Sequence, residues 1–230
     1  MRIVGITVCV RFGDYLQTTA EHNLPVFDDW IVVTDPQDLE TIEVCKSNGL
    51  IPVLSRRHQE HHEDDFNKGK MINDGIKAAS KLSDKCWLCH TDADIVLPKD
   101  LRARLERSLR LVAAPTVFRR CLFGMHRLMC NSREDWEYYL QAGNTSRFEL
   151  ECKRSSKKNL PVGFFQMWHN SRRLFYPERF GTATTSDLEF AKNFKIQERR
   201  FFDEYCIHLS QPGWCRGRDW KGRVSQRWSG

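Results

Sequence analysis

The sequence predicts an α/β protein with an open, mostly parallel, twisted sheet that is flanked by helices. Through the first hundred residues, short apolar and β-branched runs alternate with helical runs, a pattern typical of parallel βαβ units. The chain has 230 residues, enough for one sizeable α/β domain. It contains no internal repeat and no long linker, so we expect a single domain.

The first strands and the helix between them are expected from β-branched runs and turn residues. Strands are predicted at 3–10, 28–35 and 50–55, where apolar residues cluster between Gly, Asp and Pro. Gly13 and Asp14 interrupt the first run, and a helical stretch follows them. These elements would form the start of a parallel sheet.

Two further helices carry start and stop signals. Residues 36–49 have Pro36 near the start, acidic residues in the first turn and Gly49 as the stop signal. Residues 66–80 place apolar side chains at helical spacing, with Asn67 as the candidate N-cap. Both helices would connect neighbouring parallel strands.

After residue 100 the alternation weakens. Residues 101–112 predict a basic helix, and residues 115–130 predict strand and turn. Ser132 and Asp135 have the spacing of a capping box, which indicates that another helix begins there. We therefore expect a second half with mixed strand directions.

Composition restricts the class of protein. The net charge of +6 and pI of about 8.9 favour a polyanionic partner without proving one. No run approaches the roughly 20 apolar residues of a membrane span, and the N-terminus does not resemble a signal peptide. We expect a cytoplasmic protein, located in the host cytoplasm if it is viral. The 9 cysteines are expected to be mostly buried thiols, with a secreted disulfide protein as the alternative.

The segment CWLCHTDADIVLP, residues 86–98, has three interpretations. Cys86, Cys89 and His90 have the spacing of a haem attachment site, but the surrounding apolar residues predict a buried strand. No second cysteine pair has zinc-ligand spacing. We therefore expect the two thiols to pack in a strand, while a redox or zinc role stays open.

The acidic end of the same segment indicates a metal site. Side chains two residues apart in an extended strand point the same way, so Asp92 and Asp94 would present two carboxylates together. Ligands of open α/β sheets bind at the carboxyl ends of the strands. Carboxylates there suit Mg²⁺ or Mn²⁺ with substrate phosphates. The alternative is a solvated turn that contains two acids.

Five stretches, in order, resemble the nucleotide-diphospho-sugar glycosyltransferases of the GT-A fold, particularly their family-2-like members. The resemblance extends to compact members carried by bacteriophages and other viruses, some of which are implicated in DNA modification. It implies one GT-A-like domain over 1–230, with a nucleotide-sugar half at 1–98 and an acceptor half with a tail at 99–230. The matching stretches are FNKGKMINDGIKAA (66–79), CWLCHTDADIVLP (86–98), VGFFQMWH (162–169), TTSDLEF (184–190) and CIHLSQPGWCRGRDWKGR (206–223).

This resemblance implies metal-dependent hexosyl transfer from a nucleotide-diphosphate sugar, with a UDP-sugar such as UDP-glucose as the expected donor. Mn²⁺ or Mg²⁺ would stabilise the departing diphosphate as a Lewis acid. Asp94 would bind the metal, Asp92 the metal or the ribose, and His208 would be the third metal ligand. The alternative for His208 is a buried strand histidine.

The resemblance also implies donor-binding residues. They follow the first two strands, begin the helix at 66–80 and lie in the tail, where Lys221 would add a cation. Lys68 is an alternative to Lys70. The implied residues are Val10, Arg11, Asp35, Asn67, Lys70, Asp92, Trp220 and Arg223.

Asp187 is the residue that the resemblance implies as general base of an inverting transfer. The alternative role for Asp187 is an N-cap carboxylate for a helix from residue 188, and Glu189 is a competing base. A carboxylate near the anomeric carbon is also compatible with retention of configuration.

The leading acceptor hypothesis is a hydroxymethylated pyrimidine such as hydroxymethylcytosine in double- or single-stranded DNA. Basic residues interleaved with aromatic ones fit a DNA-tracking surface, and a base in a duplex must be flipped out to react. A glycan, lipid or protein acceptor is the alternative, and a non-catalytic nucleic-acid-binding module is the second. His58, His61 and His62 are a further candidate metal cluster. The candidate acceptor residues are Phe165, Trp168, His169, Trp214 and Arg216, and the basic residues are Arg102, Arg104, Arg107, Arg110, Arg119, Arg120, Lys153, Arg154, Lys157, Lys158, Arg218 and Arg227.

Overall fold

The computed structural model describes the chain except for residues 61–65, 112–114, 151–159, 162, 180–182 and 210–230. The described residues form one sheet of nine strands, in the order β3-β2-β1-β4-β8-β6-β9-β5, with β7 paired to β6. The strands are β1 (Ile3–Val8), β2 (Asp29–Thr34), β3 (Ile51–Leu54), β4 (Trp87–Thr91), β5 (Ile95–Val96), β6 (Leu122–Cys130), β7 (Glu149–Leu150), β8 (Phe165–His169) and β9 (Arg199–Leu209).

The sheet has a parallel half and a mixed half, as the sequence predicts. Strands β3, β2, β1 and β4 are all parallel, with Gly5 of β1 opposite both Trp30 of β2 and Cys89 of β4. β8 is antiparallel to β4 and to β6, whereas β9 is parallel to β6. The carboxyl ends of the first four strands therefore meet at one edge, where an open α/β sheet binds its ligands.

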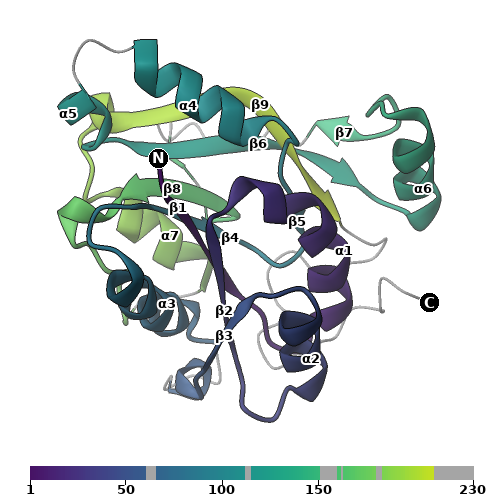
Figure 1. The fold of residues 1–230 in the computed structure, drawn as a ribbon, viewed down its shortest axis with the longest axis horizontal. Helices are drawn as coiled ribbons and strands as arrows, with labels where there is room; N and C mark the ends of the chain where they lie inside the picture. Colours follow the sequence, from purple (N-terminus) through teal and green to yellow (C-terminus); the bar gives the residue numbers. More distant parts are fainter. Residues whose placement is uncertain (61–65, 112–114, 151–159, 162, 180–182, 210–230) are drawn as a thin grey trace.

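Helices cover both faces of this sheet (Figure 1). α1, α2 and α4 contribute to a hydrophobic cluster on one face, and α3 and α7 contribute to a cluster on the other. Each large apolar side chain buried in these clusters stabilises the fold by roughly 1.5–3 kcal/mol. The helices are α1 (Gly13–Asn23), α2 (Leu39–Ser47), α3 (Lys68–Leu82), α4 (Leu101–Leu111), α5 (Pro115–Phe118), α6 (Arg133–Ala142) and α7 (Ala183–Ala191).

Two predicted helix starts are confirmed and one is corrected. The Asn67 side chain accepts a hydrogen bond from the Lys70 backbone N–H at 3.0 Å, and Ser132 accepts one from Asp135 at 3.1 Å. The helix predicted from residue 36 begins instead at Leu39, because Asp38 is its N-cap. The residues before Asp38 form a turn that ends at this cap.

The strand predicted over residues 86–98 is two strands with different partners. β4 ends at Thr91, and a turn through Asp92 and Asp94 leads into β5. β5 pairs antiparallel with β9, so that Ile95 lies opposite His208. The prediction of one strand was wrong here because an apolar run specifies burial, whereas the choice of partner strand is non-local.

Cys86 and Cys89 are both buried in the core. Burial raises the pKa of Cys86 to about 11 and raises that of Cys89 further, so both remain protonated packing residues, as expected. Within the described part of the chain, no helix is both long and apolar enough to cross a membrane.

Candidate functional site

Backbone hydrogen bonds hold the turn between β4 and β5 on both sides. The Asp92 backbone N–H donates to the carbonyl of Phe164 at 3.2 Å, and the Leu209 N–H donates to the carbonyl of Asp94 at 2.9 Å. The Ile95 N–H closes the turn onto Asp92 at 3.3 Å. Both carboxylates are therefore fixed at the ligand-binding edge of the sheet.

Asp94 and His208, two of the predicted metal ligands, lie next to each other. His208 Nε2 lies 3.0 Å from Asp94 Oδ2, and its Nδ1 lies 3.4 Å from the sulfur of Met129. The other oxygen of Asp94, Oδ1, is buried and has no hydrogen-bond partner among the described residues. An unpaired buried carboxylate oxygen is costly unless a cation or donor reaches it, so this pair fits a divalent cation.

No group of three or more candidate ligands that could hold a metal occurs in the ranges that the structure describes. The pair of Asp94 and His208 is nevertheless compatible with Mg²⁺ or Mn²⁺. Mg²⁺ usually keeps several waters and binds through one or two carboxylates and substrate phosphates. A site of this kind would be completed by the substrate.

Asp92 has a different partner, Lys68 of α3. Lys68 Nζ lies 2.6 Å from Asp92 Oδ1, and its side chain is only 12% exposed. Burial alone would raise the pKa of Asp92, but Lys68 and His90 together outweigh that effect and hold the pKa well below its usual range. Burial likewise lowers the pKa of Lys68, while Asp92 and Asp187 together raise it above its usual value. A charged ion pair thus lies inside the site.

The structure separates the two lysines that the sequence left as alternatives. Lys70 points away to the surface, where its Nζ lies 2.9 Å from Glu60 Oε2. Lys68 Nζ is 3.5 Å from the carbonyl oxygen of Gly163, beneath the candidate base. Residues two apart on a helix do not face the same way, so only Lys68 enters the site.

Asp187 lies in the interior of α7 and not at its start, since the helix begins at Ala183. The N-cap role for Asp187 is therefore wrong. Its carboxylate is packed so tightly on Gly163 that a Cβ there would overlap it. Burial raises the pKa of Asp187, although Lys68 opposes the shift. The competing Glu189 is exposed and pairs with Lys192.

A network of buried hydrogen bonds holds the backbone at Asp187. Gln166 Nε2 donates to the backbone carbonyls of Asp187 at 3.2 Å and Pro161 at 2.8 Å, and the Tyr176 hydroxyl donates to Gln166 Oε1. The Tyr176 ring stacks on Phe190, with centroids 4.0 Å apart and an interplanar angle of 2°. The sequence reasoning missed Gln166 and Tyr176, because buried polar pairs carry no local pattern.

His90 was considered in the sequence only as a haem ligand. It is fully buried, and its Nδ1 donates to the carbonyl of Ile6 at 3.1 Å. The opposite nitrogen, Nε2, lies 3.5 Å from Asp92 Oδ1. The signal that could have found it is its position two residues before Asp92, because an extended chain places side chains at this spacing on one face.

The carboxyl ends of β1, β2 and β3 carry residues that were predicted to bind the nucleotide, and we call this the nucleotide edge. Asp35 Oδ2, after β2, lies 3.4 Å from His58 Nε2, after β3. Arg11, after β1, is exposed and adopts a left-handed backbone with φ of 64°. Val10 is half-buried and packs beside the core. His58 thus pairs with Asp35, while His61 and His62 lie outside the described residues.

The predicted acceptor residues that the structure describes do not form a surface. Phe165 and Trp168 are fully buried in β8, and His169 is 5% exposed against Trp87. These three side chains belong to the core, and we do not propose them as acceptor ligands. Trp214, Arg216, Trp220, Lys221 and Arg223 lie outside the described residues.

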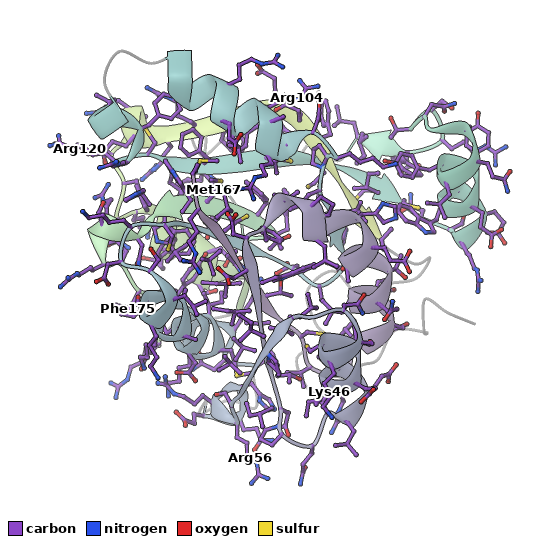
Figure 2. The ribbon with its side chains drawn as sticks, in the orientation of Figure 1. Lys46, Arg56, Arg104, Arg120, Met167 and Phe175 are labelled. Carbon is purple, nitrogen blue, oxygen red and sulfur yellow. The ribbon has the colours of Figure 1, made fainter. Side chains whose placement is uncertain are left out.

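Two arginines of the predicted DNA surface are neutralised by carboxylates. Arg102 pairs with Asp28 at 2.9 Å, and Arg104 pairs with Glu204 at 2.8 Å. Figure 2 shows Arg104 on α4, at the outer surface of the molecule. These pairs reduce the positive charge that α4 offers to a phosphate backbone.

The sheet order and the strand-end site define the class of fold: the chain has the GT-A-type α/β fold that the resemblance implies. No protein-family profile and no curated protein matches the sequence. Among solved structures, the chain resembles glucosyl-3-phosphoglycerate synthase from Mycobacterium tuberculosis. Its complex with Mn²⁺, UDP-glucose and phosphoglyceric acid matches with a TM-score of 0.58 and 12% identity, over 92% of this chain and 72% of that one. Its complex with Mg²⁺ and UDP matches with a TM-score of 0.57 at the same identity and coverage.

Proposed function

We propose that the protein is a metal-dependent glycosyltransferase that uses a UDP-sugar donor. The observation that carries the proposal is the Asp94–His208 pair, whose buried carboxylate oxygen has no partner among the described residues. It lies at the strand edge where such sheets bind nucleotides. The solved structures that share the fold were obtained with UDP, UDP-glucose and Mn²⁺ or Mg²⁺, which supports this donor and these ions.

Asp94 and His208 would hold the divalent cation, which when bound acts as a Lewis acid toward the leaving diphosphate. Lys68 keeps Asp92 ionised and adds a second positive charge to the site. Asp92 is then oriented to accept a hydrogen bond from a ribose or sugar hydroxyl. The chain thus separates cation binding by Asp94 from donor orientation by Asp92.

Asp187 would act as the general base of an inverting transfer. Its carboxylate takes the proton of the acceptor hydroxyl while the acceptor oxygen bonds to the anomeric carbon. The bond between that carbon and the phosphate oxygen breaks, and its electron pair leaves with UDP. Burial makes the Asp187 carboxylate more basic, and Gln166 fixes the backbone that carries it.

The identity of the acceptor is a separate hypothesis from that of the donor. Transfer to a hydroxymethylated pyrimidine in DNA stays our leading prediction, with a glycan, lipid or protein hydroxyl as the alternative. The ion pairs of Arg102 and Arg104 argue against α4 as the DNA-binding element. Transfer of labelled glucose to hydroxymethylcytosine DNA, compared with plain DNA of the same sequence, decides between these acceptors.

The donor half of the proposal is tested by hydrolysis of UDP-glucose in the absence of acceptor. We expect release of UDP that requires Mn²⁺ and falls at least about 100-fold in Asp94→Ala, because the leaving group loses its cation. Asp84→Ala, at an exposed turn residue, is the matched control and should retain wild-type hydrolysis. Equal hydrolysis by Asp94→Ala and wild type would refute the metal assignment.

A further inference from the structure

Two non-glycine residues of the described chain have a positive φ: Arg11 at 64° and Arg173 at 47°. A left-handed conformation costs an ordinary residue roughly 1–2 kcal/mol. Such residues persist where the surroundings enforce the conformation, and they cluster at functional sites. Arg11 lies directly after β1 at the nucleotide edge, whereas Arg173 ends a short 3₁₀ helix elsewhere.

Asp38 is the residue that holds Arg11 in place. Its carboxylate Oδ2 accepts the Arg11 backbone N–H at 2.5 Å and the hydroxyls of Thr41 at 2.7 Å and Thr34 at 3.3 Å. Its other oxygen caps α2 through the Thr41 N–H at 3.2 Å. A simple N-cap needs only the last of these bonds. The additional bonds tie the ends of β1 and β2 together through one buried carboxylate.

The turn that Asp38 holds carries Arg11, a positively charged residue, at the nucleotide edge. Burial lowers the pKa of His58, and the charge of Arg11 lowers it further against the opposing effect of Asp35. Arg11, Asp35 and His58 follow the carboxyl ends of β1, β2 and β3, which are neighbouring parallel strands, so the three residues lie at the same edge of the sheet. Phe66 packs against the His58 ring, with centroids 5.4 Å apart. This edge combines a guanidinium donor, a carboxylate acceptor and ring surfaces, which is suitable chemistry for a nucleoside.

We propose that Asp38 is a positioning residue of the donor site, which holds Arg11 in the left-handed conformation that lets its guanidinium bind the nucleoside part of the donor. The proposal rests on the proposed function and deepens it. Asp38 does not touch the donor and acts only through Arg11. Glycine would adopt this conformation freely but has no side chain that could bind the ligand.

The first experiment compares Arg11→Gly with Arg173→Gly. Both substitutions relieve a left-handed backbone, so both should fold with unfolding temperatures close to or above wild type. Binding of UDP with Mn²⁺, measured by calorimetry, should weaken at least about tenfold in Arg11→Gly alone, as expected for one lost charge-assisted hydrogen bond. UDP affinity in Arg11→Gly within about twofold of wild type would overturn the proposal.

The second experiment tests whether Asp38 acts through Arg11. Asp38→Asn should weaken UDP binding in the wild-type background and should have no further effect in Arg11→Gly, because the two residues form one unit. Ser132→Ala removes the N-cap of α6 and controls for a loss of helix stability, so its UDP affinity should be unchanged. Additive effects of Asp38→Asn and Arg11→Gly would show that Asp38 is only structural.

The two proposals fail in different ways. If the wild-type protein binds neither UDP nor another nucleoside diphosphate, the proposed function is overturned and this inference falls with it. If wild type binds UDP but Arg11→Gly and Asp38→Asn bind it equally well, only the role of Asp38 and Arg11 is overturned.

Discussion

At the scale of single residues, two aspartates with the same local sequence signal have different environments. Asp92 pairs with Lys68 at 2.6 Å, and Asp94 pairs with His208 at 3.0 Å. Their partners come from α3 and β9, far apart in the chain. The sequence motif predicts both carboxylates, but only the fold assigns a lysine to one and an imidazole to the other.

The role of Lys68 can be tested against its neighbour on the same helix. We expect Lys68→Ala to lower kcat for sugar transfer by at least about tenfold, because a buried cation near the leaving diphosphate is lost. Lys70→Ala should leave kcat near wild type, since Lys70 pairs with Glu60 at the surface. A steady-state comparison of the two variants is sufficient. An equal loss of kcat in both variants would mean that transfer depends on the start of α3 as a whole and not on the charge of Lys68.

We expect replacement of Asp187 to change stability and activity in opposite directions. Its pKa is raised mainly by burial, so the folded state favours the protonated carboxyl, and stability is lost as pH rises through this elevated pKa. Asp187→Asn removes the ionised form and should be more stable than wild type at pH 7 in urea unfolding. The same variant should lose at least about 100-fold in transfer rate, because no base remains. A variant less stable than wild type at pH 7 but equal to it at pH 3 would contradict this account.

The pH dependence of transfer follows from the same carboxyl. A base must be ionised to accept a proton, so the rate should fall as pH decreases through the raised pKa of Asp187. The acidic limb should therefore lie above the usual range of an aspartate. A pH profile of kcat in wild type measures it, and a limb in the ordinary aspartate range would argue against Asp187 as the base.

At the scale of elements, local signals predicted helices better than strand partners. The N-caps Asn67 and Ser132 were read directly from the sequence, because a cap depends on residues three positions apart. The division of residues 86–98 into β4 and β5 was not, because it depends on pairing between Ile95 and the distant His208. For the same reason Asp94 was predicted as a metal ligand from spacing, whereas its partner His208 was predicted only from the family resemblance.

The close packing of Asp187 on Gly163, in the segment before β8, can be tested by substitution. Gly163 leaves space for the Asp187 carboxylate, because a Cβ at this position would overlap it. Gly163→Ala should displace Asp187 and reduce transfer at least about tenfold while Mn²⁺ binding at Asp94 is retained. Gly143→Ala, at the left-handed end of α6, should reduce stability without affecting the rate at protein concentrations where it is folded. Unaltered transfer by Gly163→Ala would contradict the close packing.

At the scale of the whole molecule, one sheet joins the two halves of the chain that were predicted to bind the donor and the acceptor. β4 of the first half pairs along five residues with β8 of the second, and Figure 1 shows the strands continuing across that boundary. We expect a single unfolding transition, with circular dichroism and tryptophan fluorescence giving the same midpoint. Two separated midpoints would indicate that the halves are independent domains. The parallel half was predictable from alternation. Mixed strand directions were expected for the second half, but its strand order was not predictable, because that order does not follow the chain.

The pairing of β5 with β9 has a consequence for when the protein can work during its synthesis. Asp94 and His208 are 114 positions apart, and β9 is the last strand that the structure describes. A ribosome-bound chain that has emerged only as far as α7 contains Asp94 but lacks His208, the imidazole of the proposed cation site. Under the proposed function, products truncated before β9 would not complete this site and would not transfer sugar.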